Sequence, residues 1–549
     1  HEEAHSNKLM TLHYAANTQC EDLYSAAIRW AAPYNEPLPI RPQANERQGE
    51  RPLRIGYVSA DFNRHPIGFY LDRILPFHTS DKFEIVCYSN NRKTDDVTER
   101  LRAATILWRD VVGVSDQKMA QQIREDKIDI LVDLSGHTAG NRLSVFAMRP
   151  APVQVTWMGY TGTTGLKAMD FILADTFVLP EHEQEYFTET VKYLPGSYLC
   201  FDPPRVDLSV EPPPVTNAGH ITFGSFNNRI KITPEAIAVW SNILKAVSGS
   251  QILLKTTLLD DAGVRQSVLE QFQANGIDED RVMLEGRSPR DELLKAYQRI
   301  DIALDTLPYG GGVTTAEAIW MGVPVISLRS ERWSGRLGET ILNAIGVPEL
   351  VAENRDQYCT MAIDLAQDSP RLEAYYRDLR DLMEISAFCD GPAFASKLEQ
   401  AYEEMWAAYI PENTATCGER TLSIDDGYNE AVAHQQNGQT AEAEEIYRLI
   451  LEVDVNHTGA LHNLGVIIMD QGNLEEALSL FDKSISLAPD IAPFHNSRGV
   501  ALFKARRLAD AIKAYRKSTS INPNNPQALR NIGTALREIH KPAKALVHF

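Results

Sequence analysis

The last fifth of this 549-residue chain repeats every 34 residues, and this period constrains the structure more than any other feature of the sequence. Three positions of the repeat each keep one kind of residue. Glycine occupies the first (Gly465, Gly499, Gly533), alanine the second (Ala443, Ala477, Ala511, Ala545) and an aromatic ring the third (Tyr447, Phe481, Tyr515, Phe549). Small residues let two helices approach closely, and the ring fills the gap between them. The period therefore predicts an all-α stack of helix–turn–helix units over residues 426–549, an arrangement that usually binds protein.

Composition excludes several classes of protein. The net charge is −20, so the chain lacks the basic excess of a nucleic-acid binder, and we expect no nucleic-acid partner. No run of about eighteen apolar residues is present, so we expect no membrane partner. The six cysteines are scattered without a CxxC pair, which favours reduced thiols and a cytoplasmic location. Homo-oligomerisation is left open. The chain begins with His1 and ends within a repeat, so we expect a fragment of a longer protein.

Residues 53–328 alternate short apolar runs with amphipathic stretches, as in βα units on buried parallel sheets. A first series of runs is Leu53–Ser59, Phe83–Ser89, Ile128–Ser135, Val153–Gly159 and Phe171–Val178. After the proline-rich break at 203–214 comes a second: Ile221–Phe226, Gln251–Lys255, Arg281–Glu285, Ile302–Leu307 and Val323–Leu328. We predict a helical lead-in and linker (1–50), two Rossmann-like lobes (51–210 and 215–410), helices over 355–409 and a linker over 410–424.

Ligands of open α/β sheets bind beyond the carboxyl ends of the strands, so the residues there are the candidates for chemistry. His65 and His137 each follow a strand of the first lobe and can exchange a proton or hold a substrate hydroxyl. A capping or hydrogen-bonding role in a turn is the alternative for each. In the second lobe, Lys231 precedes a helix start at Thr233-Pro234, a natural place for a phosphate, although a solvated loop lysine is the simpler reading.

A glycine run follows the fourth strand of the second lobe. Gly310, Gly311 and Gly312 leave backbone amides free, and Thr314 and Thr315 add hydroxyls at the start of the next helix. This combination is a suitable cradle for a diphosphate, and Glu317 could reach a ribose diol. A tight glycine turn with a helix cap is the structural alternative. The pattern is neither GxGxxG nor a Walker A motif.

The sequence predicts no metal and no cofactor. Asp278-Glu279-Asp280 is formally a DxD motif, but it precedes a strand rather than following one. No His/Cys cluster has the spacing of metal ligands, and no GxSxG nucleophile motif is present.

Several segments, taken in order, resemble the protein O-GlcNAc transferase and SPINDLY family, glycosyltransferase family 41, and the repeats resemble tetratricopeptide repeats. The segments are 53–66, 135–142, 149–160, 224–231, 304–306, 321–325, 335–336 and 405–406. The resemblance implies a GT-B fold of two Rossmann-like lobes. It also implies metal-independent, inverting transfer of a sugar from a nucleotide diphosphate to a protein hydroxyl.

The resemblance also implies roles for residues. Lys231 matches the lysine that holds the β-phosphate, Asn228 an amide on the same loop, and His65 the active-site histidine, and His137 lies in a shared segment. The expected nucleotide-sugar site is Asn228, Arg290, Leu293, Gly311, Gly312, Thr314, Thr315, Glu317 and Arg336. Leu293 stands at the position where O-GlcNAc transferases stack a histidine on uracil. The Gly-His-Thr-Thr motif of those enzymes is absent, and Gly311-Gly312-Val313-Thr314-Thr315 stands in its place.

UDP-GlcNAc is therefore the expected donor by a modest margin. The alternatives are a SPINDLY-like GDP-fucose protein O-fucosyltransferase and a non-catalytic repeat scaffold. The repeats follow the catalytic region here, whereas they normally precede it in the family. The resemblance suggests that Asn429, Asn463 and Asn531, with Ser497 interrupting, form a ladder that holds an extended peptide acceptor. A merely polar face of the stack is an equal alternative.

Overall fold

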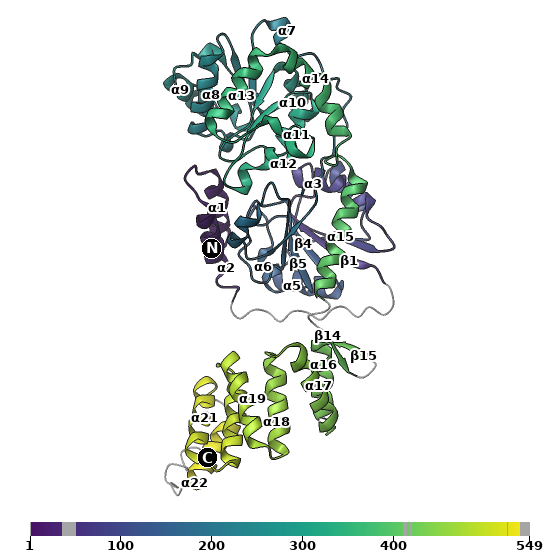
Figure 1. The fold of residues 1–549 in the computed structure, drawn as a ribbon, viewed down its shortest axis with the longest axis vertical. Helices are drawn as coiled ribbons and strands as arrows, with labels where there is room; N and C mark the ends of the chain where they lie inside the picture. The colour runs from purple at the N-terminus through teal and green to yellow at the C-terminus, as the bar shows by residue number, and fades with distance from the viewer. Residues whose placement is uncertain are drawn as a thin grey trace. The chain divides into compact units, whose positions relative to one another are not determined.

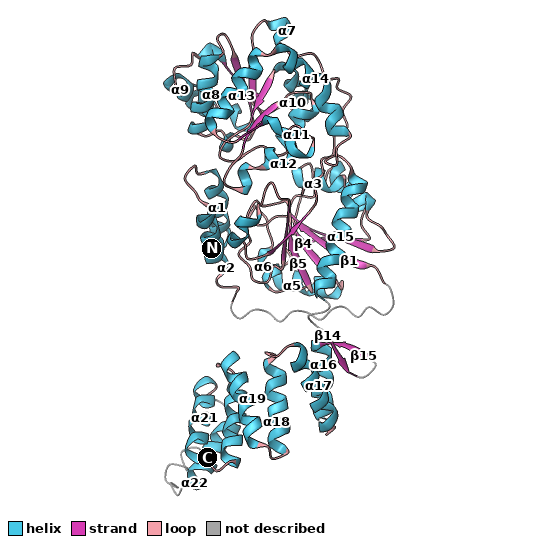
Figure 2. Cartoon of the chain, viewed as in Figure 1, coloured by secondary structure: helices cyan, strands magenta, loops and turns pink. Residues whose placement is uncertain are grey.

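The computed structural model describes residues 2–35, 51–409, 414–417, 420–436, 438–523 and 525–538. The chain divides into two compact units, His1–Met405 and Trp406–Phe549. The first unit holds two parallel sheets with helices packed on them, and the second holds the helical repeats (Figure 1, Figure 2). The two α/β lobes and the all-α repeats expected from the sequence are both present.

The first lobe is built on a seven-stranded parallel sheet with the strand order β3-β2-β1-β4-β5-β6-β7. Its strands are β1 Leu53–Ser59, β2 Phe83–Ser89, β3 Leu107–Asp110, β4 Ile130–Asp133, β5 Val153–Thr156, β6 Phe171–Ala174 and β7 Thr190–Tyr193. Its helices are α3 Pro66–Asp72, α4 Asp96–Ala103, α5 Asp116–Glu125 and α6 Leu143–Ala147. The central strands β4 and β5 are buried along their whole length, including the polar side chains of Asp133, Gln154 and Thr156.

The second lobe has a six-stranded parallel sheet with the order β10-β9-β8-β11-β12-β13. Its strands are β8 Thr222–Ser225, β9 Gln251–Lys255, β10 Val282–Glu285, β11 Ile302–Leu304, β12 Val325–Leu328 and β13 Val351–Ala352. Its helices are α7 Val215–Ala218, α8 Pro234–Ala246, α9 Ala262–Ala274, α10 Arg290–Ala296, α11 Val313–Trp320 and α12 Leu337–Ala344. Helix α8 starts as predicted: Pro234 is its first residue, and the Thr233 side chain accepts a hydrogen bond from the Ala236 amide at 3.1 Å.

Helices precede the first sheet and follow the second. The N-terminal pair is α1 Glu2–Tyr14 and α2 Cys20–Ala31, and the later helices are α13 Arg355–Gln367, α14 Ser369–Glu384 and α15 Gly391–Tyr409. Both sets match the prediction, whereas the predicted linker over 36–50 lies outside the described residues. Helix α15 returns to the first lobe, where the hydroxyls of Tyr402 and Tyr57 lie 2.9 Å apart.

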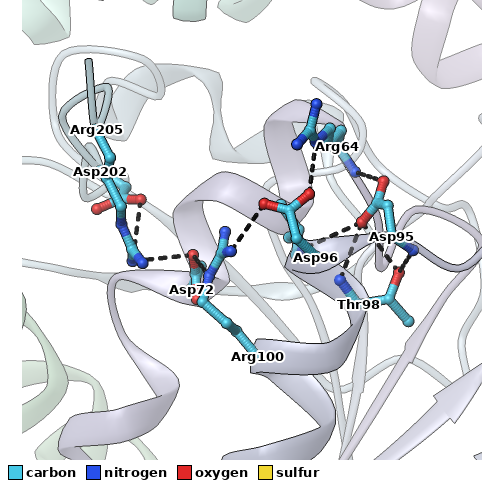
Figure 3. A network of polar contacts seen from close by, with 9 residues as sticks. Arg64, Asp72, Asp95, Asp96, Thr98, Arg100, Asp202 and Arg205 are labelled. Carbon is cyan, nitrogen blue, oxygen red and sulfur yellow. Dashed lines mark hydrogen bonds and ion pairs between the residues drawn. The ribbon is translucent and has the colours of Figure 1, made fainter. Parts of the chain in front are cut away.

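A carboxylate in the first lobe joins α3, α4 and the connection between the lobes (Figure 3). Asp72, the last residue of α3, accepts a hydrogen bond at 2.7 Å from Arg100 of α4. It accepts another at 3.2 Å from Arg205, which belongs to the connection between the lobes. Asp72 is buried. Because His65 caps the other end of α3, this network holds the helix that carries a candidate site residue.

The repeats form seven helices within the described part of the second unit. They are α16 Ile424–Gln436, α17 Thr440–Val453, α18 Thr458–Asp470, α19 Leu474–Leu487, α20 Ala492–Lys504, α21 Leu508–Ile521 and α22 Pro526–Glu538. The glycine and aromatic positions meet as expected. A Cβ on Gly465 would lie 2.8 Å from the Phe481 ring, and one on Gly499 would lie 2.5 Å from the Tyr515 ring. Residues 539–549, which include the last alanine and aromatic positions, lie outside the described residues.

The predicted linker between the two units differs from the structure. Two short strands, β14 Thr414–Cys417 and β15 Arg420–Ser423, pair antiparallel within it. Threonine at 414, 416 and 421 gives this polar stretch a strand preference that its overall polarity conceals.

Candidate active site

A cavity of about 360 Å³ lies between the two lobes of the first unit and collects several of the candidate residues. The first lobe contributes Asp61, His65 and Tyr70 to its wall. The second lobe contributes Lys231, Tyr309 and Gly312, and Met10 of α1 also lines it. His65, Lys231 and Gly312 of the glycine run thus line one cavity, as expected for residues that follow strands of the two sheets.

Lys231 is the cation of the second-lobe wall. It ends the short 3₁₀ turn Arg229–Lys231. Its Nζ donates a hydrogen bond to the Gly310 carbonyl at 2.6 Å and lies 4.0 Å from the centroid of the Tyr309 ring. Burial lowers the pKa of Lys231 to about 8, and nearby Asp305 opposes this shift only in part. No carboxylate among the described residues lies within hydrogen-bond distance of this ammonium, so it can still neutralise an anion.

The glycine run is ordered by Asp305, a residue that the sequence analysis did not single out. The buried Asp305 carboxylate accepts hydrogen bonds from the Gly311 amide at 2.6 Å and from the Ser327 hydroxyl at 2.8 Å. Gly312 then precedes α11, so the amino end of that helix meets the cavity. Free amides at a helix start favour negative charge.

The two threonines of the predicted cradle have different surroundings. The Thr314 hydroxyl donates to Asn227 at 2.9 Å on the partly exposed side of α11. The Thr315 side chain is buried and donates to the Gly311 carbonyl at 3.1 Å. Thr315 therefore closes the glycine turn rather than facing the cavity.

Glu317 and Arg290, both predicted to bind the nucleotide, contact each other. Their side chains form an ion pair at 2.8 Å. Arg290 also lies 4.2 Å from the centroid of Phe69, which belongs to the first lobe. Burial raises the pKa of the Glu317 carboxyl, and Arg290 opposes the rise.

The remaining nucleotide candidates of this lobe lie outside the cavity wall. Asn228 is exposed, and its side chain accepts from the Ile230 amide at 3.3 Å. Leu293 is partly buried on α10.

His65 stands on the first-lobe side of the cavity. Its Nδ1 accepts a hydrogen bond from the Ile67 amide at 3.4 Å and lies 3.7 Å from an Asp61 carboxylate oxygen. Burial lowers the pKa of His65, and Asp61 partly opposes the shift, so the imidazole is neutral near pH 7. A neutral ring that accepts at Nδ1 carries its proton on Nε2. His65 can therefore offer an N–H donor to a substrate oxygen.

His137 does not reach the cavity. It is fully buried beneath α1 and α2, where its ring contacts Trp30 edge-on at 4.7 Å between centroids. Nε2 donates to the Thr164 carbonyl at 3.0 Å, and Nδ1 lies 3.3 Å from the Ser6 hydroxyl. Burial lowers the pKa of His137 to about 4. Both ring nitrogens are occupied, so this histidine supports the packing of the N-terminal helices rather than contacting substrate.

Arg336, predicted to bind the nucleotide sugar, is also placed elsewhere. It is buried and forms a two-point ion pair with Glu183 of the first lobe, with one N–O distance of 2.8 Å. It also donates to the Ser330 carbonyl at 2.6 Å. The guanidinium therefore joins the two lobes and has no free edge for a ligand.

The predicted asparagine ladder is partly occupied by neighbouring side chains. Asn463 Nδ2 lies 3.1 Å from the hydroxyls of both Tyr428 and Tyr447. Asn531 donates to Asn496 at 3.1 Å, and Asn429 is exposed. To bind all three asparagines, a peptide backbone would thus have to replace internal hydrogen bonds at two of the three positions.

Membrane-spanning helices and metal-binding clusters are both absent from the described parts of the chain. There, no helix is both long enough and apolar enough to cross a membrane. Nor do three or more His, Cys, Asp or Glu side chains of these ranges gather in a way that could hold a metal ion.

Comparison with protein families gives two matches. The family described as glycosyl transferase family 41 matches residues 33–206 and 216–398. The tetratricopeptide repeat matches residues 428–492 and 469–528.

Curated proteins are similar to this chain over 74% of its length. A protein of Arabidopsis thaliana named "Probable UDP-N-acetylglucosamine--peptide N-acetylglucosaminyltransferase SPINDLY" is 38% identical over 415 residues, covering 74% of this chain and 45% of its own length. Its namesake in Solanum lycopersicum is 38% identical and is covered over 44% of its length. The chain therefore spans less than half of these relatives.

A solved structure, a mutant O-GlcNAc transferase of Thermobaculum terrenum, is similar with a TM-score of 0.70 and 37% identity. The similarity covers 74% of this chain and 78% of that one. The expected pair of Rossmann-like lobes in a GT-B arrangement is thereby confirmed.

Proposed function

Because this chain belongs to glycosyltransferase family 41, we propose that it transfers N-acetylglucosamine from UDP-N-acetylglucosamine to Ser or Thr hydroxyls of protein substrates. One observation carries the proposal. Lys231 Nζ is fixed in the interlobe cavity beside the amino end of α11, and the wall of the first lobe supplies His65. A cation, free amides and a neutral imidazole around one cavity suit the departure of a diphosphate.

Breaking the sugar–phosphate bond increases the negative charge on the leaving diphosphate. Lys231 and the amides at Gly312 and Val313 would stabilise this charge, because they are already oriented and need no rearrangement. We propose that they replace a divalent metal ion. Direct attack by the acceptor hydroxyl would then form the new bond at the anomeric carbon as the bond to the diphosphate breaks, with inversion of configuration, and the hydroxyl proton would pass to an oxygen of the departing diphosphate.

His65 has a positioning role in this scheme. Its Nε2–H would donate to an oxygen of the acceptor or of the diphosphate, since Nδ1 already accepts from Ile67. The hydrogen bond from Ile67 would hold the ring orientation, and the Asp61 carboxylate, 3.7 Å from Nδ1, would act through its charge. His65 thus orients a reacting group and does not need to remove a proton itself.

The nucleoside would bind where Arg290 and Glu317 now pair. Arg290 and Glu317 lie 2.8 Å apart. A ribose diol can accept a hydrogen bond from the guanidinium and donate one to the carboxylate. It could therefore bind between the two side chains without leaving either charge unsatisfied. The hydrophobic face of Leu293 would lie nearby on α10. This arrangement does not select between uracil and guanine by itself.

The tetratricopeptide repeats would present the protein acceptor. Exposed Asn429 is available for a peptide backbone, whereas Asn463 and Asn531 would exchange internal hydrogen bonds for peptide ones.

The test is donor-specific transfer followed by intact-protein mass spectrometry. The purified chain is incubated with protein acceptors and with UDP-N-acetylglucosamine or GDP-fucose. We expect addition of N-acetylhexosamine to Ser or Thr with the first donor and none for Lys231→Ala. Addition of deoxyhexose with the second donor alone would instead establish a SPINDLY-like fucosyltransferase. Acceptor binding without transfer from either donor would establish a scaffold.

A further inference from the structure

A second cavity, of about 540 Å³, lies beside the one that holds Lys231. The turn between α1 and α2 encloses it together with the segments that follow β11, β12 and β13. One loop separates the two cavities: Thr306–Pro308 line this one, while Tyr309 and Gly312 line the other. The second cavity is thus distinct from the site assigned to the donor.

Arg332 is the unusual residue of this cavity. It is only 4% exposed, yet it lines the cavity wall. Its guanidinium donates one hydrogen bond, from Nη1 to the Leu12 carbonyl at 3.3 Å. An arginine side chain carries five N–H donors. Among the described residues nothing accepts from the other four, and none of the carboxylates there forms an ion pair with it.

The carboxylates Glu331 and Glu235 oppose the effect of burial on Arg332 only in part. Arg329 pairs with Glu339 at 2.6 Å, and Arg355 pairs with Glu235, so these two cations already have partners. Glu331 and Asp356 also line the cavity, but both are exposed to solvent, and neither comes within ion-pair distance of Arg332. Burial lowers the pKa of Arg332, which reflects the cost of holding this charge away from water.

A neutral histidine is buried beside Arg332. His13 of α1 is fully buried, and neither of its ring nitrogens has a hydrogen-bond partner in the described part of the chain. Burial first, and the charge of Arg332 second, lower the pKa of His13 to about 3, so this ring stays neutral. Within the part of the chain that the structure describes, Arg332 therefore has charged neighbours but no ion-paired carboxylate.

We propose that this cavity is a binding site for a small oxyanion, a carboxylate or phosphate group, held by Arg332. The planar guanidinium offers such a group two parallel N–H donors, and the desolvated setting strengthens the contact. The hydroxyls of Thr18 and Ser330 line the same wall and can donate to it.

Occupancy would tie the N-terminal helices to the second lobe. Arg332 already contacts the end of α1, and Tyr14 of α1 stacks on Tyr309 with centroids 5.1 Å apart. Tyr309 in turn covers Lys231. The ligand would thus stabilise the segment that closes one side of the donor cavity.

The test is titration calorimetry on the full chain with two probes, sodium malonate and inorganic phosphate, at ionic strength matched with sodium chloride. Four proteins are compared: wild type, Arg332→Gln, Arg355→Gln and Lys231→Met. Arg355→Gln is the matched control, because it removes the same charge from the same cavity at an exposed, ion-paired position. Lys231→Met removes anion binding in the donor cavity. A melting curve of each variant verifies folding.

We expect at least tenfold weaker binding for Arg332→Gln, with less than a twofold change for Arg355→Gln and with binding retained in Lys231→Met. The tighter probe identifies the group as carboxylate or phosphate. Loss of binding only in Lys231→Met, equal binding in wild type and Arg332→Gln, or no binding beyond chloride would overturn the proposal. If Arg332→Gln does not fold, Arg332→Lys replaces it. Lysine keeps the charge without the two-point donor, so unchanged affinity there would also contradict the assignment.

Discussion

Replacing Lys231 with methionine should separate stability from catalysis. Burial lowers the pKa of Lys231 from 10.5 to about 8. One pKa unit corresponds to 1.36 kcal/mol, so keeping this amine charged in the folded protein costs roughly 3 kcal/mol near neutral pH. Methionine has a similar shape and no charge. We therefore expect Lys231→Met to be at least as stable as wild type at pH 7, by up to about 3 kcal/mol.

The difference in stability should depend on pH in a defined direction. Below pH 8 the lysine is protonated in both the folded and the unfolded chain, and the full cost is present. Between about pH 8 and 10.5 the folded protein releases the proton while the unfolded chain keeps it, so the wild type gains stability as pH rises. The advantage of Lys231→Met should shrink over this interval.

Although Lys231→Met should not lower stability, it should lower the rate of sugar transfer. Losing one preorganised contact to the leaving group costs about 2.7–4 kcal/mol of transition-state stabilisation, or a 100- to 1,000-fold lower kcat. The assays are initial rates of sugar transfer and urea unfolding followed by tryptophan fluorescence. Six of the seven tryptophans lie in the first unit and the seventh, Trp406, lies in α15, so the fluorescence reports on the α/β region rather than on the repeat helices.

Lys82→Met is the matched control for this experiment. Lys82 is an exposed lysine paired with Glu403 at 3.3 Å, and such a surface pair contributes only about 0–1 kcal/mol. The reasoning is refuted if Lys231→Met keeps wild-type turnover, or if it unfolds more easily than wild type at pH 7.

Three further outcomes are expected. Transfer should survive EDTA because Lys231 and the α11 amides neutralise the diphosphate, whereas loss reversed by Mn²⁺ or Mg²⁺ would reject metal-free catalysis. Removing residues 410–549 should spare transfer to short peptides and reduce transfer to whole proteins; an equal loss with a lower melting temperature would mean that the repeats only support the fold. Arg336→Met should destabilise the first unit by about 3–5 kcal/mol in urea unfolding, because it leaves Glu183 charged and buried. Arg336→Met combined with Glu183→Leu should recover most of that loss, and a double variant no more stable than the single one would contradict this account.

The strands that could be predicted from the sequence are those with continuous apolar character. All five predicted for the first sheet and all five for the second are present. The three that were missed, β3, β7 and β13, lie at sheet edges. β3 and β7 are partly exposed along their length and mix charged and apolar residues, so neither strand periodicity nor an apolar run marks them. β13 has only two residues, too few for a pattern.

Those parts of the site that depend on strand ends could be predicted from the sequence. Those that depend on contacts between segments distant in the sequence could not. His65, Lys231 and Gly312 meet because parallel strands end at one edge of each sheet. His137 also follows a strand, but α1 and α2 cover it, and nothing local in the sequence indicates where those helices dock. The ion pair of Arg336 could not be predicted for the same reason, since its partner Glu183 lies 153 residues away.

The repeat geometry has a consequence for how this chain can change in length. Two glycines of the repeat face the aromatic ring of their own unit: Gly465 faces Phe481, and Gly499 faces Tyr515. A unit therefore contains its own closest contact and meets its neighbours through equivalent surfaces. Duplicating or deleting 34 codons in frame would insert or remove one whole unit and leave every remaining junction chemically the same. Replication slippage at this locus would lengthen the array by whole steps, whereas the α/β region offers no comparable point of growth.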